Sequence, residues 1–169
     1  MKKCVFAGTF DPPTAGHKTT VEKSLKIFDC VVVALMVNPE KKPFLSVDER
    51  EFLLKKMFAE DSRVTVRVFN DCAAVDVLER ENTIFYVRGV RDGIDFEYEN
   101  RNHFASKKLK DDMVTVYIPA EQEEIHVSSS LVRSCVRFKK EYLQYIPAAI
   151  REDVEKMLEN KRANGELNI

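Results

Sequence analysis

The strongest constraint on the fold of this chain is the regular alternation of short apolar runs with segments of helical period. Runs rich in Val, Ile and Phe predict β-strands at 4–7, 31–37, 64–69, 83–87 and 113–118. Apolar residues that recur every three or four positions predict helices at 16–28, 72–80, 95–109, 129–138 and 147–161. A further helix is expected after the capping box that Ser46 and Glu49 form.

Strands that alternate with helices are joined by right-handed crossovers and form a parallel sheet. We therefore expect an α/β fold with a five-stranded parallel sheet and helices on both faces. The run 31–37 is apolar at every position, as is typical of a strand at the centre of such a sheet. Because the sequence shows no internal repeat and no linker, we expect residues 1–161 to form one domain. Residues 162–169 carry Asn, Gly and Glu and are expected to be a disordered tail.

Composition argues against several classes of function. The chain has 27 Lys and Arg against 28 Asp and Glu, so no basic excess favours binding to nucleic acid. No apolar run approaches the roughly 18 residues that span a bilayer, and the apolar stretch near the N-terminus is too short for a secretory signal. The 4 cysteines form no CxxC pair, and no carboxylate cluster has metal-ligand spacing. We expect a cytoplasmic protein without a metal site of its own.

In a parallel sheet, ligands bind beyond the carboxyl ends of the strands. The loops expected to start at Gly8, Asn38, Asn70, Arg88 and Pro119 share this rim. The functional site is therefore expected where these loops meet.

The first of these loops, 8–17, has the features of a phosphate site. Gly16 allows a ligand to approach the start of the following helix, whose free N–H groups and partial positive charge suit a phosphate. His17 lies in the first turn of that helix, and Thr9 adds a hydroxyl. A lone histidine here would more often be a capping or packing residue, so its role depends on the rest of the loop.

Three other loops carry candidate phosphate contacts. Lys41 and Lys42 follow the central strand, and spacing alone does not separate them from each other or from solvated lysines. Arg88 and Arg91 flank Gly89, which favours an anion clamp with close backbone approach over ion pairs with Asp92 and Asp95. Three serines at 128–130 precede a helix and suit the β- and γ-phosphates of a nucleotide, although one of them could simply be a helix cap.

Specific motifs connect these loops to a known family. Residues 8–17 read GTFDPPTAGH, and the last four resemble the T/HxGH signature of the nucleotidyltransferase superfamily. Together with DFEYE at 95–99 and SSSLVR at 128–133, they make the chain similar to bacterial-type phosphopantetheine adenylyltransferases from residue 3 to residue 158. The resemblance implies a Rossmann-like nucleotidyltransferase fold, Mg²⁺-dependent use of ATP and, commonly, a homo-hexamer. It implies transfer of AMP to 4′-phosphopantetheine, giving dephospho-coenzyme A and pyrophosphate in coenzyme A biosynthesis.

The resemblance also implies roles for individual residues. The catalytic residues are Thr9, His17 and Lys41. The residues that bind ATP are Thr9, Phe10, His17, Gly89, Val90, Arg91, Glu99, Glu124, Ile125, His126, Val127, Ser128, Ser129 and Ser130. The residues that bind phosphopantetheine are Thr9, Lys41, Ala73 and Arg88. The family usually has Trp where this chain has Glu124, and a larger apolar residue where it has Ala73.

The expected mechanism is an in-line attack of the acceptor phosphate on the α-phosphorus of ATP, which needs no general base. His17 would donate a hydrogen bond to the α-phosphate. The alternatives are another nucleotidyltransferase, such as a nicotinamide mononucleotide adenylyltransferase or a glycerol-phosphate cytidylyltransferase, or a non-catalytic nucleotide-binding regulator.

Overall fold

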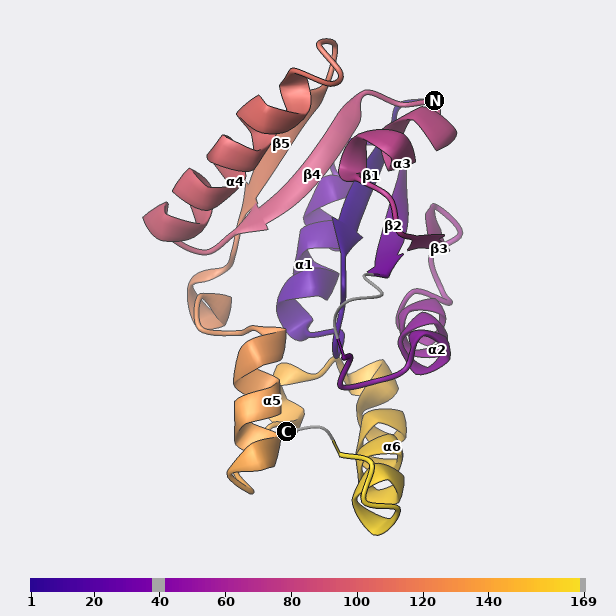
Figure 1. Ribbon diagram of the computed structural model, residues 1–169, viewed down its shortest axis with the longest axis vertical. Coiled ribbons are helices and arrows are strands. Elements are labelled where there is room, and N and C mark those ends of the chain that lie inside the picture. The colour runs from indigo at the N-terminus through magenta and orange to yellow at the C-terminus, as the bar shows by residue number, and fades with distance from the viewer. Residues whose placement is uncertain (38–41, 168–169) are drawn as a thin grey trace.

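The computed structural model describes residues 1–37 and 42–167 and contains one five-stranded sheet (Figure 1). All neighbouring strands are parallel, in the order β3-β2-β1-β4-β5. The strands are β1 (Lys3–Gly8), β2 (Cys30–Val37), β3 (Val64–Asn70), β4 (Phe85–Val90) and β5 (Val114–Pro119). The expected α/β fold with a five-stranded parallel sheet is confirmed.

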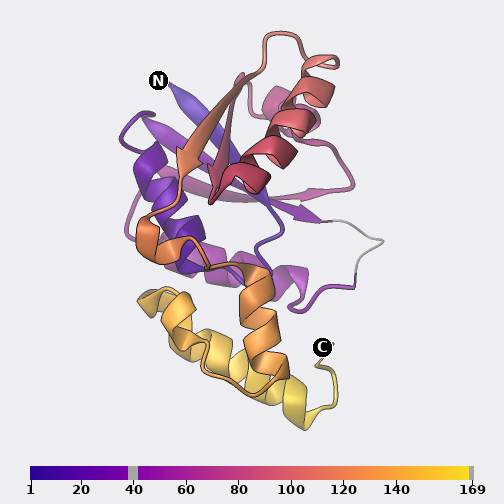
Figure 2. The same ribbon diagram turned by 90° about the vertical axis from the view of Figure 1, so that its left-hand side faces the viewer.

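Helices cover both faces of the sheet and close its carboxyl end. The α-helices are α1 (Ala15–Ser24), α2 (Val47–Met57), α3 (Ala74–Arg80), α4 (Gly93–Lys107), α5 (Ser129–Arg137) and α6 (Arg151–Ala163). In the described part of the chain the short 3₁₀ helices are η1 (Gln122–Glu124), η2 (Leu143–Tyr145) and η3 (Ala148–Ile150). Helices α1 and α2 pack on one face and α3 on the other, while α5 and α6 lie beyond the carboxyl ends of the strands (Figure 2).

The core consists of two apolar clusters, one on each side of the sheet. Along β2, Val31, Val33 and Leu35 face the cluster that includes α1, α2, α5 and α6. The alternate residues Val32 and Ala34 face the cluster that includes α3. The strand is therefore buried on both faces, as its uninterrupted apolar sequence predicted.

Strand β4 begins and ends later than the predicted 83–87. The side chain of Thr83 donates to the carbonyl of Lys3 at 2.6 Å, which holds this residue in the turn before the strand. At the other end, β4 stays paired with β5 as far as Pro119. Arg88 and Gly89 consequently lie within the strand and not in the loop that was expected to start at Arg88.

The C-terminal region also differs from expectation. The predicted helix 147–161 is divided, because η3 follows Pro147 and α6 begins only at Arg151. Helix α6 continues to Ala163, inside the segment expected to be disordered, and Leu167 packs against the larger apolar cluster. Within residues 1–37 and 42–167, no helix combines the length and apolarity that a membrane crossing requires.

Candidate active site

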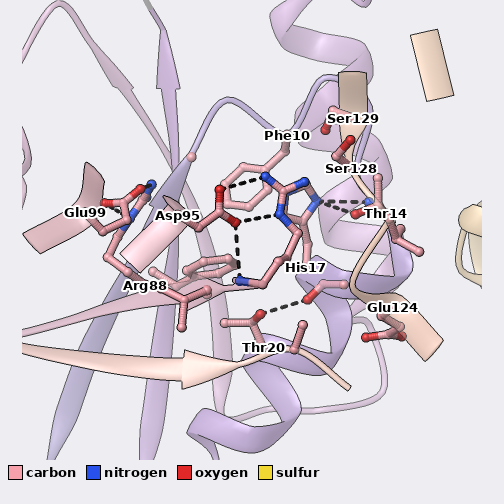
Figure 3. A pocket seen from close by; sticks show the side chains of 18 of the residues that line it. Phe10, Thr14, His17, Thr20, Arg88, Asp95, Glu99, Glu124, Ser128 and Ser129 are labelled. Atoms are coloured by element: carbon pink, nitrogen blue, oxygen red, sulfur yellow. Dashed lines mark hydrogen bonds and ion pairs between the residues drawn. The ribbon is translucent and has the colours of Figure 1, made fainter. Parts of the chain in front are cut away.

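A cavity of about 280 Å³ opens at the carboxyl end of the sheet, where the β1–α1 loop, β4, α4 and the segment before α5 meet (Figure 3). Of the predicted nucleotide contacts, the structure brings together Thr9, Phe10, His17, Gly89, Val90, Arg91, Glu99, Glu124, Val127, Ser128 and Ser129. Arg88, predicted for the acceptor, lines the same cavity. Residues from distant parts of the chain therefore converge on one site.

The first loop is held in place by an aspartate and a buried aromatic ring. Asp11 accepts hydrogen bonds from the backbone N–H groups of Phe44 at 2.7 Å and Leu45 at 2.8 Å. Phe10 is buried with a positive φ of 47°, and its ring lies where a side chain at Gly8 would stand, 3.1 Å from a Cβ placed there. The absence of a side chain at Gly8 leaves space for the Phe10 ring, and this ring packs against the imidazole of His17.

Two arginines that sequence reasoning missed anchor the same loop from outside the cavity. Arg50 is buried in α2 and donates from Nη1 to the carbonyl of Thr9 at 2.8 Å. Arg133 of α5 donates from Nη1 to the carbonyl of Asp11 at 2.7 Å. Burial lowers the pKa of Arg50 from its usual value, although Asp11 and Glu49 oppose the shift. Only Arg133 carried a sequence signal, because it closes the SSSLVR motif.

His17 is a neutral hydrogen-bond donor. Its Nδ1 accepts the backbone N–H of Thr14 at 3.0 Å, so this nitrogen is unprotonated and the proton resides on Nε2. The ring packs edge-on against Phe10, with centroids 4.9 Å apart. Burial lowers the pKa of His17 to about 4, and the positive charges of Arg88 and Arg91 add to the effect. Nε2–H is therefore available to an oxygen atom of a ligand in the cavity.

Two arginine–carboxylate pairs connect β4 and the residue that follows it to α4. Arg88 forms a bidentate pair with Glu99 and donates from Nη1 to the carbonyl of Ala7 at 2.7 Å. Arg91 pairs with Asp95 through Nε at 2.6 Å and Nη2 at 3.0 Å. Burial opposes the charge of Arg88, but Tyr86 and Glu99 outweigh it and raise the pKa of the guanidinium. The sequence favoured an anion clamp over ion pairs with Asp92 and Asp95, but Arg91 does pair with Asp95. Both arginines nevertheless line the cavity.

Gly89 has a packing role that the sequence did not predict. A Cβ at this position would lie 2.9 Å from Oγ1 of Thr20 in α1. That hydroxyl donates to the carbonyl of Gly16 at 2.8 Å, so its position is fixed. Glycine therefore permits a close approach between β4 and α1, while the predicted contact of Gly89 with a ligand stays a prediction.

Two of the three serines in this segment line the site. Ser128 caps α5 and accepts from the N–H of Leu131 at 3.1 Å, and Ser129 donates to the carbonyl of Pro12 at 2.8 Å. Both serines line the cavity. The structure does not place the other three residues predicted from this segment in the cavity lining: Ile125, His126 and Ser130.

Glu124 brings a carboxylate into the cavity. Its Oε1 accepts the hydroxyl of Thr19 at 2.9 Å. Its Oε2 is buried and has no hydrogen-bond partner among the residues that the structure describes. Sequence reasoning placed Glu124 among the ATP contacts and noted it as a departure from the family, but it did not predict this unpaired oxygen.

A second cavity of about 310 Å³ lies beside the first, between α4 and the sheet. Arg88 and Glu99 line both cavities, so their ion pair forms part of the wall between them. Ala74 lines the second cavity, whereas the predicted Ala73 lines neither and is the N-terminal cap of α3. The predicted acceptor contact at Ala73 therefore lies outside the lining of both cavities.

The structure describes only one of the two candidate lysines. Lys41 lies outside the described residues. Lys42 is exposed and lines neither cavity. Within the described part of the chain, no group of three or more His, Cys, Asp or Glu side chains could hold a metal ion.

Comparison with known proteins shows the family to which this chain belongs. A family model described as cytidylyltransferase-like matches residues 5–135. A Streptococcus agalactiae serotype Ia protein named phosphopantetheine adenylyltransferase is 35% identical over 158 residues, covering 94% of this chain and 98% of the relative. The chain belongs to the phosphopantetheine adenylyltransferase family. Other members with that name are 33% identical in Streptococcus pneumoniae (89% of this chain, 93% of the relative) and 32% identical in Clostridium perfringens (98% and 100%).

Family membership confirms the resemblance carried by the GTFDPPTAGH, DFEYE and SSSLVR segments. It identifies the chain as an adenylyltransferase of the nucleotidyltransferase class and does not favour the alternative functions. The cavity at the carboxyl rim is accordingly the candidate active site of this family member.

Proposed function

We propose that this protein transfers AMP from ATP to the phosphate of 4′-phosphopantetheine, releasing pyrophosphate in a step of coenzyme A biosynthesis. The observation that carries the proposal is the convergence of His17, Arg91 and Ser129 on one cavity at the carboxyl rim. A donor, a cation and a helix N-terminus together suit a chain of phosphate groups. The names of the relatives supply the acceptor.

The proposed chemistry depends on positioning and charge stabilisation. The acceptor phosphate is already nucleophilic and attacks the α-phosphorus in line, so a P–O bond forms as the bond to pyrophosphate breaks. Nε2–H of His17 donates to an α-phosphate oxygen, and the Thr9 hydroxyl and Lys41 stand beside it in the proposal. Arg91 and the N-terminus of α5 with Ser128 and Ser129 hold the leaving pyrophosphate.

The second cavity suits the arm of the acceptor. It lies between α4 and the sheet and includes Ala74, Tyr86 and Asn102 in its lining. Arg88 in the shared wall places a guanidinium where the acceptor phosphate would enter the nucleotide cavity.

Mg²⁺ enters this proposal with ATP. Bound to phosphate oxygens, it would supply positive charge that stabilises the transferring and leaving groups. The carboxylates of Asp95 and Glu99 are engaged by arginines, so they are poorly placed as metal ligands. The chain's own contribution is to hold the phosphates through His17, Arg91 and Ser129.

We also propose a cytoplasmic homo-oligomer, with a hexamer as the expected form. No nucleic-acid partner is proposed, since the net charge is -1. All 4 cysteines are free, which suits a reducing compartment. Helix α4 has no buried residue and exposes Ile94, Tyr98 and Phe104, an apolar face that a second copy of the chain would cover.

A pyrophosphate-release assay tests the proposed function. ATP is offered with 4′-phosphopantetheine, nicotinamide mononucleotide or glycerol 3-phosphate in separate reactions. We expect release only with 4′-phosphopantetheine, together with formation of dephospho-coenzyme A. Release with another acceptor alone, or ATP binding without turnover on any of the three, would contradict the proposal.

A further inference from the structure

Arg91 contacts a carboxylate of its own chain inside the nucleotide cavity. Its Nε and Nη2 donate to the two oxygens of Asp95 at 2.6 Å and 3.0 Å, and its backbone N–H donates to Oδ2 at 3.3 Å. Both residues line the cavity together with His17 (Figure 3). Within the described part of the chain, Asp95 accepts every hydrogen bond that the Arg91 side chain donates, so the donors that would hold a phosphate are already engaged.

The two ion pairs of the cavity differ in how firmly they are held. Arg88 donates to the carbonyl of Ala7 at 2.7 Å in addition to its pair with Glu99, and the side chains of that pair are 25% and 11% exposed. The side chains of Arg91 and Asp95 are 38% and 26% exposed. A partly exposed ion pair contributes little free energy, because water solvates both charges. The pair between Arg91 and Asp95 is therefore the one that a ligand can exchange.

Helix α4 places the Asp95 carboxylate where a phosphate would bind. Asp95 lies in the first turn of α4, and its N–H donates at 2.8 Å to Oδ1 of Asp92, the N-terminal cap. The hydrogen bonds from Arg91 lower the pKa of Asp95, so the carboxyl group is ionised at neutral pH. A carboxylate and a phosphate offer a guanidinium the same paired acceptors and the same sign of charge. Asp95 and a phosphate group consequently compete for the same donors.

We propose that Asp95 is an internal competitor of phosphate at Arg91, which lowers the affinity of the cavity for polyphosphates and favours the release of pyrophosphate. The proposal rests on the proposed function only in placing polyphosphates in this cavity. When a polyphosphate binds, its oxygens take the donors of Arg91, and the Asp95 side chain turns towards solvent, to which it is already partly exposed. When pyrophosphate leaves, Asp95 returns to Arg91. The guanidinium thus has an acceptor in both states.

Binding of ATP, inorganic pyrophosphate and adenosine to Asp95→Asn tests the proposal. Asparagine keeps the size of the side chain and removes its charge. Calorimetric titration is carried out without divalent cations, so that only the protein supplies positive charge. We expect the dissociation constants of ATP and pyrophosphate to fall about fivefold, the upper end of what a partly exposed ion pair contributes. The dissociation constant of adenosine, which has no phosphate, should not change.

Glu97→Gln is the matched control. It removes the same charge from the same helix, at a side chain that is 72% exposed and lies outside the lining of both cavities. We expect it to leave all three dissociation constants unaltered. An equal gain in Glu97→Gln would reduce the effect to one of net charge and overturn the proposal.

Three results with Asp95→Asn would also overturn it. Unchanged constants for ATP and pyrophosphate would show that Asp95 does not compete with them. Weaker binding of both would show that Asp95 orients Arg91 for the ligand. Equally tighter binding of adenosine would show that the change does not act through phosphate. Failure to release pyrophosphate with 4′-phosphopantetheine would refute the proposed function, whereas these dissociation constants would still decide the role of Asp95.

Discussion

His17 occupies the third position of α1, where a glutamate often completes a capping box, and its Nδ1 takes the N–H of Thr14 at 3.0 Å. This local contact fixes the tautomer, while burial against Phe10 keeps the ring neutral. A neutral imidazole with a fixed donor needs no rearrangement as charge moves on the α-phosphate. The same histidine would be a poor general base, which agrees with a reaction that requires none.

Replacing His17 with Ala removes one preorganised donor. We expect kcat to fall by about a hundredfold or more, with little change in the dissociation constant of ATP, because the contact matters most in the transition state. Lys18→Gln, an exposed change next in the chain, should leave both quantities unaltered. Steady-state kinetics and calorimetric titration of ATP check this. Weaker ATP binding with unchanged turnover would contradict the role.

The depressed pKa of His17 predicts a pH dependence of stability. Between pH 6.5 and about 4 the unfolded chain binds a proton at this residue and the folded chain does not. The free energy of unfolding therefore has its full value with respect to His17 above pH 6.5. It decreases as the pH falls to about 4, with a slope of up to about 1.4 kcal/mol per pH unit. Urea unfolding of the unaltered protein and of His17→Ala at several pH values measures this. Parallel pH profiles for the two proteins would contradict the prediction.

At the scale of elements, the site depends on how closely β4 and α1 approach. Gly89 and Thr20 meet at a distance that leaves no space for a methyl group, since a Cβ would lie 2.9 Å from the hydroxyl oxygen. Arg88 in β4, Arg91 directly after it and His17 in α1 are brought near one another where these two elements pack. A change that separates the two elements would widen the cavity without altering any residue that touches substrate.

Gly89→Ala is expected to destabilise the fold by about 1–3 kcal/mol, the usual cost of overpacking, because Thr20 Oγ1 is held by the carbonyl of Gly16. Thr20→Ala removes the obstructing atoms. The double variant should therefore lose less stability than the sum of the single variants. Chemical unfolding of the four proteins completes the cycle. Strict additivity would show that the two residues do not obstruct each other.

At the scale of the whole molecule, helix α4 differs from the other long helices in leaving its apolar residues uncovered. Ile94 is 80% exposed and Phe104 is 61% exposed, while the acids of the same helix hold Arg88 and Arg91. Assembly through this face would fix α4, and with it the two ion pairs of the site. The oligomer and the active site are therefore expected to depend on each other.

Light scattering coupled to size-exclusion chromatography tests the assembly. We expect the unaltered protein to elute as a homo-oligomer and Phe104→Glu to elute as a smaller species, because a charge would be buried in the interface. Phe138→Glu is the matched control, since Phe138 is 65% exposed at the end of α5, away from α4. An unaltered mass for Phe104→Glu, or a monomeric unaltered protein, would contradict the prediction.

The sequence predicted the sheet and the rim because apolar periodicity and loop motifs are local signals. The sequence-based predictions failed where contacts between distant parts of the chain determine the structure. The extension of β4 to Val90 follows from pairing with β5, and the role of Gly89 follows from a side chain 69 positions earlier in the chain, Thr20. The contact between Glu124 and Thr19 joins residues 105 positions apart, so no spacing rule reveals it. Long-range contacts therefore account for the missed parts of the site.

The ion pair between Arg88 and Glu99 belongs to the walls of two chambers at once. We expect a phosphate that draws the guanidinium towards one chamber to loosen the carboxylate that lines the other. Thermodynamic linkage then requires each substrate to alter the affinity of its companion by the same factor, in whichever order they arrive. We therefore expect a ligand bound in one chamber to change the affinity of the other chamber for its own ligand.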